Sequence, residues 1–206
     1  MIFQKTQFLM SCATHHQIPS APSLRIAFWG RSNVGKSSLL NSLIGKHKAR
    51  VSKTPGRTQL INLFECPAPL SIWCDLPGYG YASINHETSA KIGAMLEGYF
   101  SSDKSPNILC WLLDARHNLT KTDFEVLPFI ASLDLELIII TTKNDKFSNQ
   151  QALKQKKLLQ NQLEALNLKP QIFPISSLNK TGLLELEEYL LKTLSQNQCA
   201  PSQSAP

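Results

Sequence analysis

The segment 24–38, LRIAFWGRSNVGKSS, limits what this chain can fold into more than any other stretch. Its apolar beginning, Leu24 to Trp29, predicts a buried strand, and the apolar positions between Leu39 and Ile44 predict a helix behind it. Between them, the glycines, lysine and serine of GRSNVGKS have the spacing G-x-x-x-x-G-K-[ST] of a phosphate-binding loop. In a strand–loop–helix unit of this kind, backbone N–H groups at the helix N-terminus bind anionic phosphate, so we expect a nucleoside triphosphate site rather than a chance glycine turn.

A second motif, Asp75-Leu76-Pro77-Gly78, follows the strand predicted at 70–75. The pattern D-x-x-G is common in ordinary turns. Downstream of a phosphate loop and at a strand end, its Asp75 can hold Mg²⁺ through water, and the N–H of Gly78 can meet a γ-phosphate. The motif therefore predicts a nucleotide-sensing segment.

A third motif, Thr142-Lys143-Asn144-Asp145, follows a strongly apolar strand and matches [NT]-K-x-D. A carboxylate at Asp145 can accept hydrogen bonds from both N1–H and the N2 amino group of guanine, whereas adenine would leave it unpaired at a large cost. Lys143 would lie along the base, and a backbone N–H of Ser176-Ser177-Leu178 would reach guanine O6. A helix cap by Asp145 is the weaker alternative. Together the three motifs predict GTP.

Charge is distributed unevenly along the chain. No acidic residue precedes Glu65, whereas nine Lys and Arg residues do. A triphosphate needs few of these charges, so the surplus at 46–57 favours a second polyanion, for which RNA is the candidate; a solvated basic loop is an equal alternative. No apolar stretch is long enough to span a bilayer, and five cysteines without C-x-x-C spacing favour reduced thiols in a cytoplasmic protein.

The order of predicted elements indicates an α/β fold. Strands are expected at 24–29, 60–66, 70–75, 107–114, 135–142 and 171–175, and helices at 39–45, 87–100, 122–133, 149–166 and 182–194. Alternation of this kind predicts a P-loop NTPase with a mostly parallel sheet of about six strands, helices on both faces and one antiparallel strand near 60–66. We expect an N-terminal arm or extra strand in residues 1–22, a GTPase domain at 23–195 and a disordered tail at 196–206. The polar helix 149–166 is expected to turn Leu153, Leu159, Leu163 and Leu166 toward the core.

These motifs resemble the translation-factor-like GTPases, and closely the EngB (YihA/YsxC) family of ribosome-biogenesis GTPases in the TrmE-Era-EngA-EngB-septin-like class. The resemblance covers roughly residues 8–194 and rests on GRSNVGKSSLLN (30–41), SKTPGRTQLIN (52–62), DLPGYGYA (75–82), LDARH (113–117), TKND (142–145) and SS (176–177). It implies a GTPase that acts as a switch in assembly of the large ribosomal subunit, and thereby in growth, cell division and septation. No heptad or apolar surface pattern suggests a dimer, so a monomer is expected.

The motifs and the resemblance together define an expected site. Thr54 and Thr58 compete for a magnesium role in the loop before the second strand, and Thr58 is preferred because it directly precedes that strand. Nucleotide contacts are expected at Gly30, Arg31, Ser32, Asn33, Val34, Gly35, Lys36, Ser37, Ser38, Gly56, Arg57, Thr58, Asp75, Leu76, Pro77, Gly78, Thr142, Lys143, Asn144, Asp145, Ser176, Ser177 and Leu178, with Mg²⁺ on Ser37, Thr58 and Asp75. Lys36, Thr58, Gly78 and Asn33 are the expected catalytic residues.

Two positions bear on the rate of hydrolysis. Tyr79 stands where Ras-like enzymes place the glutamine that orients attacking water, which predicts a slow intrinsic rate, on the order of 10⁻⁴ s⁻¹ or somewhat faster. Asn33 has two open interpretations: it shapes the loop, or it helps to hold K⁺ near the β- and γ-phosphates, as in similar GTPases. A nucleotide-gated binding module with negligible turnover, and another P-loop kinase or ATPase, are the alternative functions.

Overall fold

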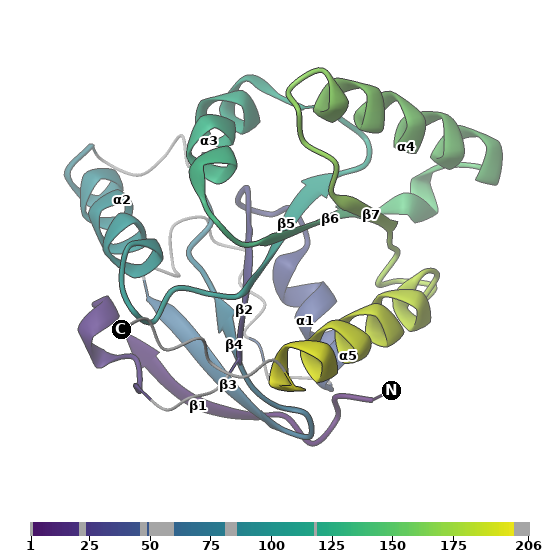
Figure 1. The fold of residues 1–206 in the computed structure, drawn as a ribbon. Helices are drawn as coiled ribbons and strands as arrows, with labels where there is room; N and C mark the ends of the chain where they lie inside the picture. The colour runs from purple at the N-terminus through teal and green to yellow at the C-terminus, as the bar shows by residue number, and fades with distance from the viewer. Residues whose placement is uncertain are drawn as a thin grey trace.

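A computed structural model describes residues 2–20, 24–45, 49, 60–80, 86–117 and 119–199. These residues form a seven-stranded sheet in the order β1-β3-β4-β2-β5-β6-β7, covered by helices (Figure 1). The strands are β1 (Gln7–Cys12), β2 (Leu24–Gly30), β3 (Ile61–Pro67), β4 (Leu70–Asp75), β5 (Ile108–Asp114), β6 (Glu136–Thr142) and β7 (Gln171–Pro174). The helices are α1 (Lys36–Ile44), α2 (His86–Phe100), α3 (Lys121–Ser132), α4 (Asn149–Glu164) and α5 (Leu183–Cys199), with short 3₁₀ turns η1 (His15–Gln17) and η2 (Asn144–Lys146).

The sheet is parallel except at β3, which pairs antiparallel with both β1 and β4. The antiparallel strand expected near residues 60–66 is thus confirmed. The sheet has one strand more than expected because the N-terminal segment contributes β1 at its edge, where Phe8 lies opposite Phe64. Ahead of β1, Phe3 is buried against Trp73, with their ring centroids 4.8 Å apart. The first residues therefore extend the sheet and the core of this domain.

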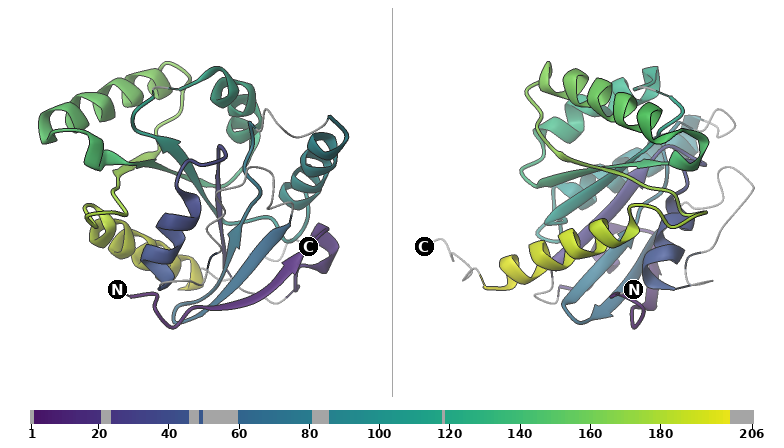
Figure 2. Two further views of the ribbon diagram at one scale, coloured as in Figure 1. Left: turned by 180° about the vertical axis from the view of Figure 1, so that it is seen from behind. Right: turned by 90° about the vertical axis from the view of Figure 1, so that its right-hand side faces the viewer.

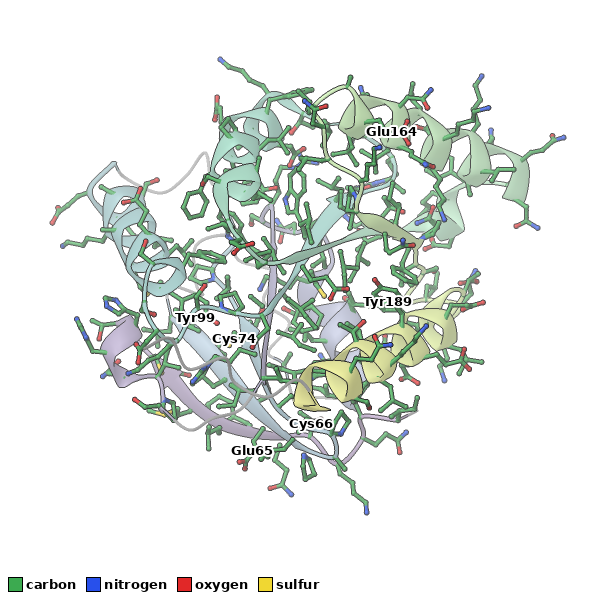
Figure 3. The ribbon with its side chains drawn as sticks, viewed as in Figure 1. Glu65, Cys66, Cys74, Tyr99, Glu164 and Tyr189 are labelled. Carbon is green, nitrogen blue, oxygen red and sulfur yellow. The ribbon has the colours of Figure 1, made fainter. Side chains whose placement is uncertain are left out.

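Helices cover both faces of the sheet, as the alternation of elements predicted. Alternate residues of β5 point to opposite sides: Ile108, Cys110 and Leu112 join the core under α1 and α5, whereas Leu109, Trp111 and Leu113 join the core under α2, α3 and α4. The views in Figure 2 show these two helix groups on opposite sides of the sheet. Over the second core, α2 is tied to the sheet by Tyr99, whose hydroxyl donates to the sulfur of Cys74 at 3.2 Å (Figure 3).

Two expectations about the C-terminal half were wrong in detail. In α4, Leu159 and Leu163 are buried, but Leu153 is 68% exposed and Leu166 is 45% exposed. Leu159 and Leu163 are one helical turn apart and lie on the same face of α4. Leu153 is six residues before Leu159, a separation that places it on a different face, and Leu166 lies beyond the end of the helix.

Helix α5 continues to Cys199, past the expected end near Leu194. No Gly or Pro interrupts residues 195–199, so nothing in that stretch stops the helix. The expected disordered tail therefore begins inside a helix, and its residues 200–206 lie outside the described part of the chain. None of the described helices is long and apolar enough to cross a membrane.

Candidate functional site

The phosphate-loop motif lies at the carboxyl end of β2, where a parallel sheet of this type places its ligands. The loop requires two left-handed residues, Asn33 with φ 59° and Gly35 with φ 109°. At Gly30, a Cβ would lie 2.6 Å from the carbonyl oxygen of Leu112, so only glycine fits there. Helix α1 begins at Lys36, and the N–H groups of its first turn have few acceptors inside the helix. The loop thus presents donors and a lysine to an anion.

Lys36 forms an ion pair with Asp75, the last residue of β4. Asp75 is only 4% exposed. Ser37 follows Lys36 in the first turn of α1, so a hydroxyl and a carboxylate oxygen are available at this end of the sheet. Oxygen donors of this kind, few in number, fit Mg²⁺, which keeps waters and takes its remaining ligands from phosphates. No cluster of three or more His, Cys, Asp or Glu side chains exists among the described residues that would bind a metal by itself.

The D-x-x-G segment lies directly against the phosphate loop. The N–H of Tyr79 donates to the carbonyl of Gly30 at 3.2 Å, and the N–H of Ser32 donates to the carbonyl of Tyr79 at 3.0 Å. A Cβ at Gly78 would lie 3.1 Å from both the Gly30 carbonyl oxygen and the Ser32 nitrogen. The two segments predicted to contact phosphate are therefore joined by their backbones, and Gly78 lies at the junction.

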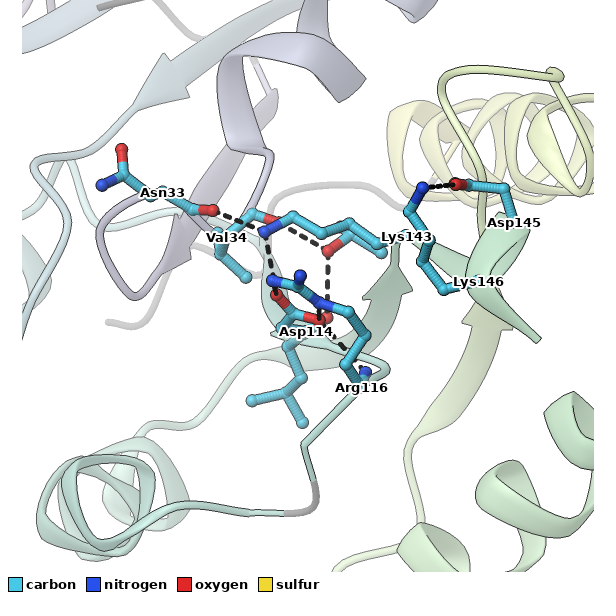
Figure 4. Close-up of polar contacts among 9 residues, drawn as sticks. Asn33, Val34, Asp114, Arg116, Lys143, Asp145 and Lys146 are labelled. Atoms are coloured by element: carbon cyan, nitrogen blue, oxygen red, sulfur yellow. Dashed lines mark hydrogen bonds and ion pairs between the residues drawn. The ribbon is translucent and has the colours of Figure 1, made fainter. Parts of the chain in front are cut away.

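The third motif is bonded to the same loop from the other side. The buried hydroxyl of Thr142 donates to the carbonyl of Val34 at 2.5 Å. Lys143 takes a left-handed φ of 60°, and its Nζ donates to the carbonyl of Asn33 at 2.9 Å and to Oδ2 of Asp114 at 2.8 Å (Figure 4). The long side chain of Lys143 thus spans from β6 across to the phosphate loop.

Asp145 lies beside the loop that follows β7. Its Oδ1 accepts a hydrogen bond of 2.8 Å from the hydroxyl of Ser176, which is fully buried. The same hydroxyl oxygen accepts from the N–H groups of Leu178 at 3.3 Å and Asn179 at 3.4 Å, so one serine organises both segments. The bond from Ser176, with a smaller contribution from Lys146, lowers the pKa of Asp145 below its usual range. Asp145 is therefore an ionised acceptor next to the Ser176–Leu178 turn.

The structure adds Asp114 to this site, at the end of β5. Arg116 donates to both of its carboxylate oxygens, at 2.9 Å and 2.7 Å, and Lys143 donates to Oδ2. Burial raises the pKa of Asp114, but the bonds from Arg116 and Lys143 outweigh it and hold the pKa well below the usual range. The sequence signal was available, because Asp114 ends an apolar strand of the parallel sheet just as Asp75 and Thr142 do.

Of the expected site residues, the structure brings together those of the phosphate loop, the D-x-x-G segment, the third motif and the Ser176–Leu178 turn. Gly56, Arg57 and Thr58, together with Thr54, lie outside the described residues, as does most of the basic stretch 46–57. The magnesium role of Thr58 stays a prediction.

By sequence, this chain is similar to known GTP-binding proteins. Residues 25–143 match a family model described as "50S ribosome-binding GTPase". The chain is 39% identical over 195 residues to "Probable GTP-binding protein EngB" of Francisella tularensis subsp. novicida (strain U112), covering 92% of this chain and 98% of the relative.

Two solved structures are similar in fold. One is a probable GTP-binding protein engB, with a TM-score of 0.66 at 25% identity over 84% of this chain and 99% of the other. The second is Era in complex with MgGDPNP and nucleotides 1506–1542 of 16S ribosomal RNA, with a TM-score of 0.68 at 27% identity over 82% of this chain and 56% of that one.

Proposed function

The chain belongs to the EngB family of GTP-binding proteins and is a GTPase, and from this premise we propose that it acts as a GTP-dependent switch in assembly of the large ribosomal subunit. The observation that carries the switch part of the proposal is the junction of three motifs. Thr142 and Lys143 bond to the phosphate loop, whose Gly30 and Ser32 in turn bond to Tyr79 beside Gly78. Loss of the γ-phosphate would therefore alter contacts that connect all three segments of the site.

In this proposal, guanine is recognised by Asp145, which accepts from N1–H and the N2 amino group, and by a backbone N–H of the Ser176–Leu178 turn at O6. The lowered pKa of Asp145 supports this assignment, because only an ionised carboxylate can accept from both donors. Gly35, Lys36, Ser37 and Ser38 bind the phosphates. Ser37 and Asp75, with Thr58 from the loop outside the described residues, would hold Mg²⁺.

The reaction is attack of a water oxygen on the γ-phosphorus. The bond from that phosphorus to the β–γ bridging oxygen breaks, GDP keeps the electron pair, and the proton of the water passes to phosphate or solvent. Lys36 and the loop N–H groups stabilise the charge that develops on the phosphate oxygens. When bound, Mg²⁺ would neutralise charge on the β- and γ-phosphates.

Hydrolysis without a partner is expected to be slow. The phenol of Tyr79 donates to Asp123 of α3 at 2.8 Å, so the side chain is held inside the protein and is not available to orient water. We also propose that Asn33 helps to hold K⁺ at the phosphates. Its exposed side chain and left-handed backbone support both this role and the role in shaping the loop.

The proposed partner is the large ribosomal subunit. The description of the matching family model supports this, and so does the basic first third of the chain. We further propose that the protein acts as a cytoplasmic monomer in ribosome assembly, and thereby in growth and division. The four cysteines whose side chains are described, Cys12, Cys66, Cys74 and Cys110, are free and buried, which suits a reducing compartment.

Single-turnover GTP hydrolysis in the presence of purified ribosomal subunits tests the proposal. Large subunits should accelerate hydrolysis well above the intrinsic rate, and small subunits at the same concentration, the matched control, should not. An unchanged rate with large subunits would indicate a nucleotide-gated binding module without catalytic turnover. Stronger acceleration by small subunits would show that the large subunit is not the partner.

A further inference from the structure

A network of hydrogen bonds joins the D-x-x-G segment to helix α3. The hydroxyl of Tyr79 donates to Oδ1 of Asp123 at 2.8 Å and accepts from the indole N–H of Trp111 at 2.7 Å. Burial, and then the neighbouring Asp123 carboxylate, raise the pKa of Tyr79 well above its ordinary value. The phenol therefore keeps the proton that it donates, and both of its hydrogen bonds lie inside the protein.

Asp123 has more partners than its local role in the helix requires. As the third residue of α3 it completes a capping box, accepting from the N–H of Thr120 at 2.8 Å and from its hydroxyl at 2.6 Å. Those bonds use Oδ2. The other oxygen, Oδ1, accepts from Tyr79 and lies 3.4 Å from Nε of Arg31 in the phosphate loop. A carboxylate that is 1% exposed thus faces both phosphate-sensing segments.

The backbone around Tyr79 is fixed on both sides. On one side it exchanges two hydrogen bonds with Gly30 and Ser32 of the phosphate loop. On the other, the left-handed Gly80, with φ 74°, lies so close to α3 that a Cβ would be 3.1 Å from Cγ2 of Thr122. Gly78 immediately precedes this residue, so the phenol anchored on α3, the bonds to the phosphate loop and the Gly78 N–H all lie within two consecutive residues.

We propose that Tyr79 and Asp123 are positioning residues that hold the N–H of Gly78 in place for the γ-phosphate, so that helix α3 sets how well the protein distinguishes GTP from GDP. This inference rests on the GTP-binding part of the proposed function and is independent of the ribosomal partner. GDP lacks the γ-phosphate, so loss of the anchor should weaken GTP selectively. A residue that served only the stability of the fold would affect both nucleotides alike.

The test compares Tyr79→Phe with Tyr189→Phe by titrating a non-hydrolysable GTP analogue and GDP against the full chain. Tyr189 of α5 (Figure 3) is the matched control, because its hydroxyl also donates to a carboxylate, Oε1 of Glu136 at 2.9 Å. Glu136 is the first residue of β6, at the opposite end of that strand from Thr142 and the site. Tyr79→Phe should lose about tenfold in affinity for the GTP analogue, the worth of one charge-assisted hydrogen bond, with GDP affinity within about twofold. Tyr189→Phe should leave both unchanged.

Asp123→Asn and the double variant give a second route that does not depend on Tyr79→Phe alone. If the two side chains act through their mutual bond, their effects on the ratio of GTP-analogue to GDP affinity should be non-additive. Thr120→Ala, which removes a cap partner without touching Tyr79, should leave that ratio unchanged.

Two results would overturn the inference: an unchanged ratio of GTP-analogue to GDP affinity in Tyr79→Phe, whether both affinities stay the same or fall equally, or additive effects in the double variant. A wild-type chain that binds neither nucleotide would instead overturn the proposed function.

Discussion

The hydroxyl of Thr142 donates to the carbonyl oxygen of Val34 at 2.5 Å, joining two motifs that lie 108 positions apart in the sequence. Both groups are buried, so the bond is made without competition from water. It fixes the phosphate loop against the end of β6, next to the residues proposed to read the base. The segments proposed to bind the phosphates and the base therefore share one buried junction.

Thr142→Val should lower the free energy of unfolding by about 1–3 kcal/mol, because valine keeps the shape of threonine but leaves the buried carbonyl of Val34 without this donor. Urea denaturation measures the change, and GDP affinity should fall with it. Ser42→Ala is the control, since its hydroxyl makes an exposed bond to the carbonyl of Ser38 within α1 and its loss should cost at most about 0.5 kcal/mol. An equal loss of unfolding free energy in the two variants would show that the Thr142 bond does not stabilise the fold as proposed.

Asp145→Asn should reduce GDP affinity by at least about 100-fold, because an amide cannot accept from both guanine donors and places its own N–H₂ against the N2 amino group. Xanthosine diphosphate has a carbonyl at that position, so its affinity should rise in the same variant. Fluorescence titration with both nucleotides checks this, with the exposed Asp134→Asn as control. If Asp145→Asn kept its preference for guanine, the assignment of the base site would be wrong.

Asp114 should contribute a pH-dependent part of the stability. Its pKa is lowered in the folded protein, so its contribution is fully present above the unfolded pKa of about 4 and is lost as the pH falls further. Asp114→Asn should therefore cost stability at pH 7 but flatten the fall of stability below pH 4, by a difference of about 1 kcal/mol after solvent screening. Urea denaturation at several pH values measures it, with the exposed Asp103→Asn as comparison. Parallel pH curves for wild type and Asp114→Asn would disprove this role.

The variant Asn33→Gly separates the two interpretations of Asn33. Glycine readily adopts the left-handed φ of 59°, so this variant removes the side chain without straining the backbone. If the side chain holds K⁺, wild-type hydrolysis should be faster in K⁺ than in Na⁺ and Asn33→Gly should lose that difference. Asn167→Gly, at another left-handed asparagine with φ 59°, is the control. Retained K⁺ stimulation in Asn33→Gly would leave the residue with its role in loop shape alone.

The sequence predicted the parallel strands and the site at their ends because both depend on local patterns. The apolar run of β5 and the motif spacings can be read within a few residues, and β4 begins and ends where the pattern indicated. Features set by contacts across the fold could not be read in this way. The bond between Tyr79 and Asp123 joins residues 44 positions apart, and no short motif encodes it.

Two further differences have similar causes. The pattern of residues 1–22 allows an arm or an extra strand, and β1 shows that the strand forms; the pattern alone does not decide, because an edge strand has only one partner, here β3. In α4, the leucine pattern predicts a wider buried face than the structure has, since of the four expected leucines only Leu159 and Leu163 face the sheet.

Above all, we propose that GTP controls binding of this protein to the large ribosomal subunit. Co-sedimentation with separated large and small subunits, in a GTP analogue and in GDP, tests it most directly. We expect the protein to sediment with large subunits in the GTP analogue, less so as salt is added, and to sediment little with GDP or with small subunits. Binding to large subunits that is the same in both nucleotides, or binding to small subunits alone, would contradict it.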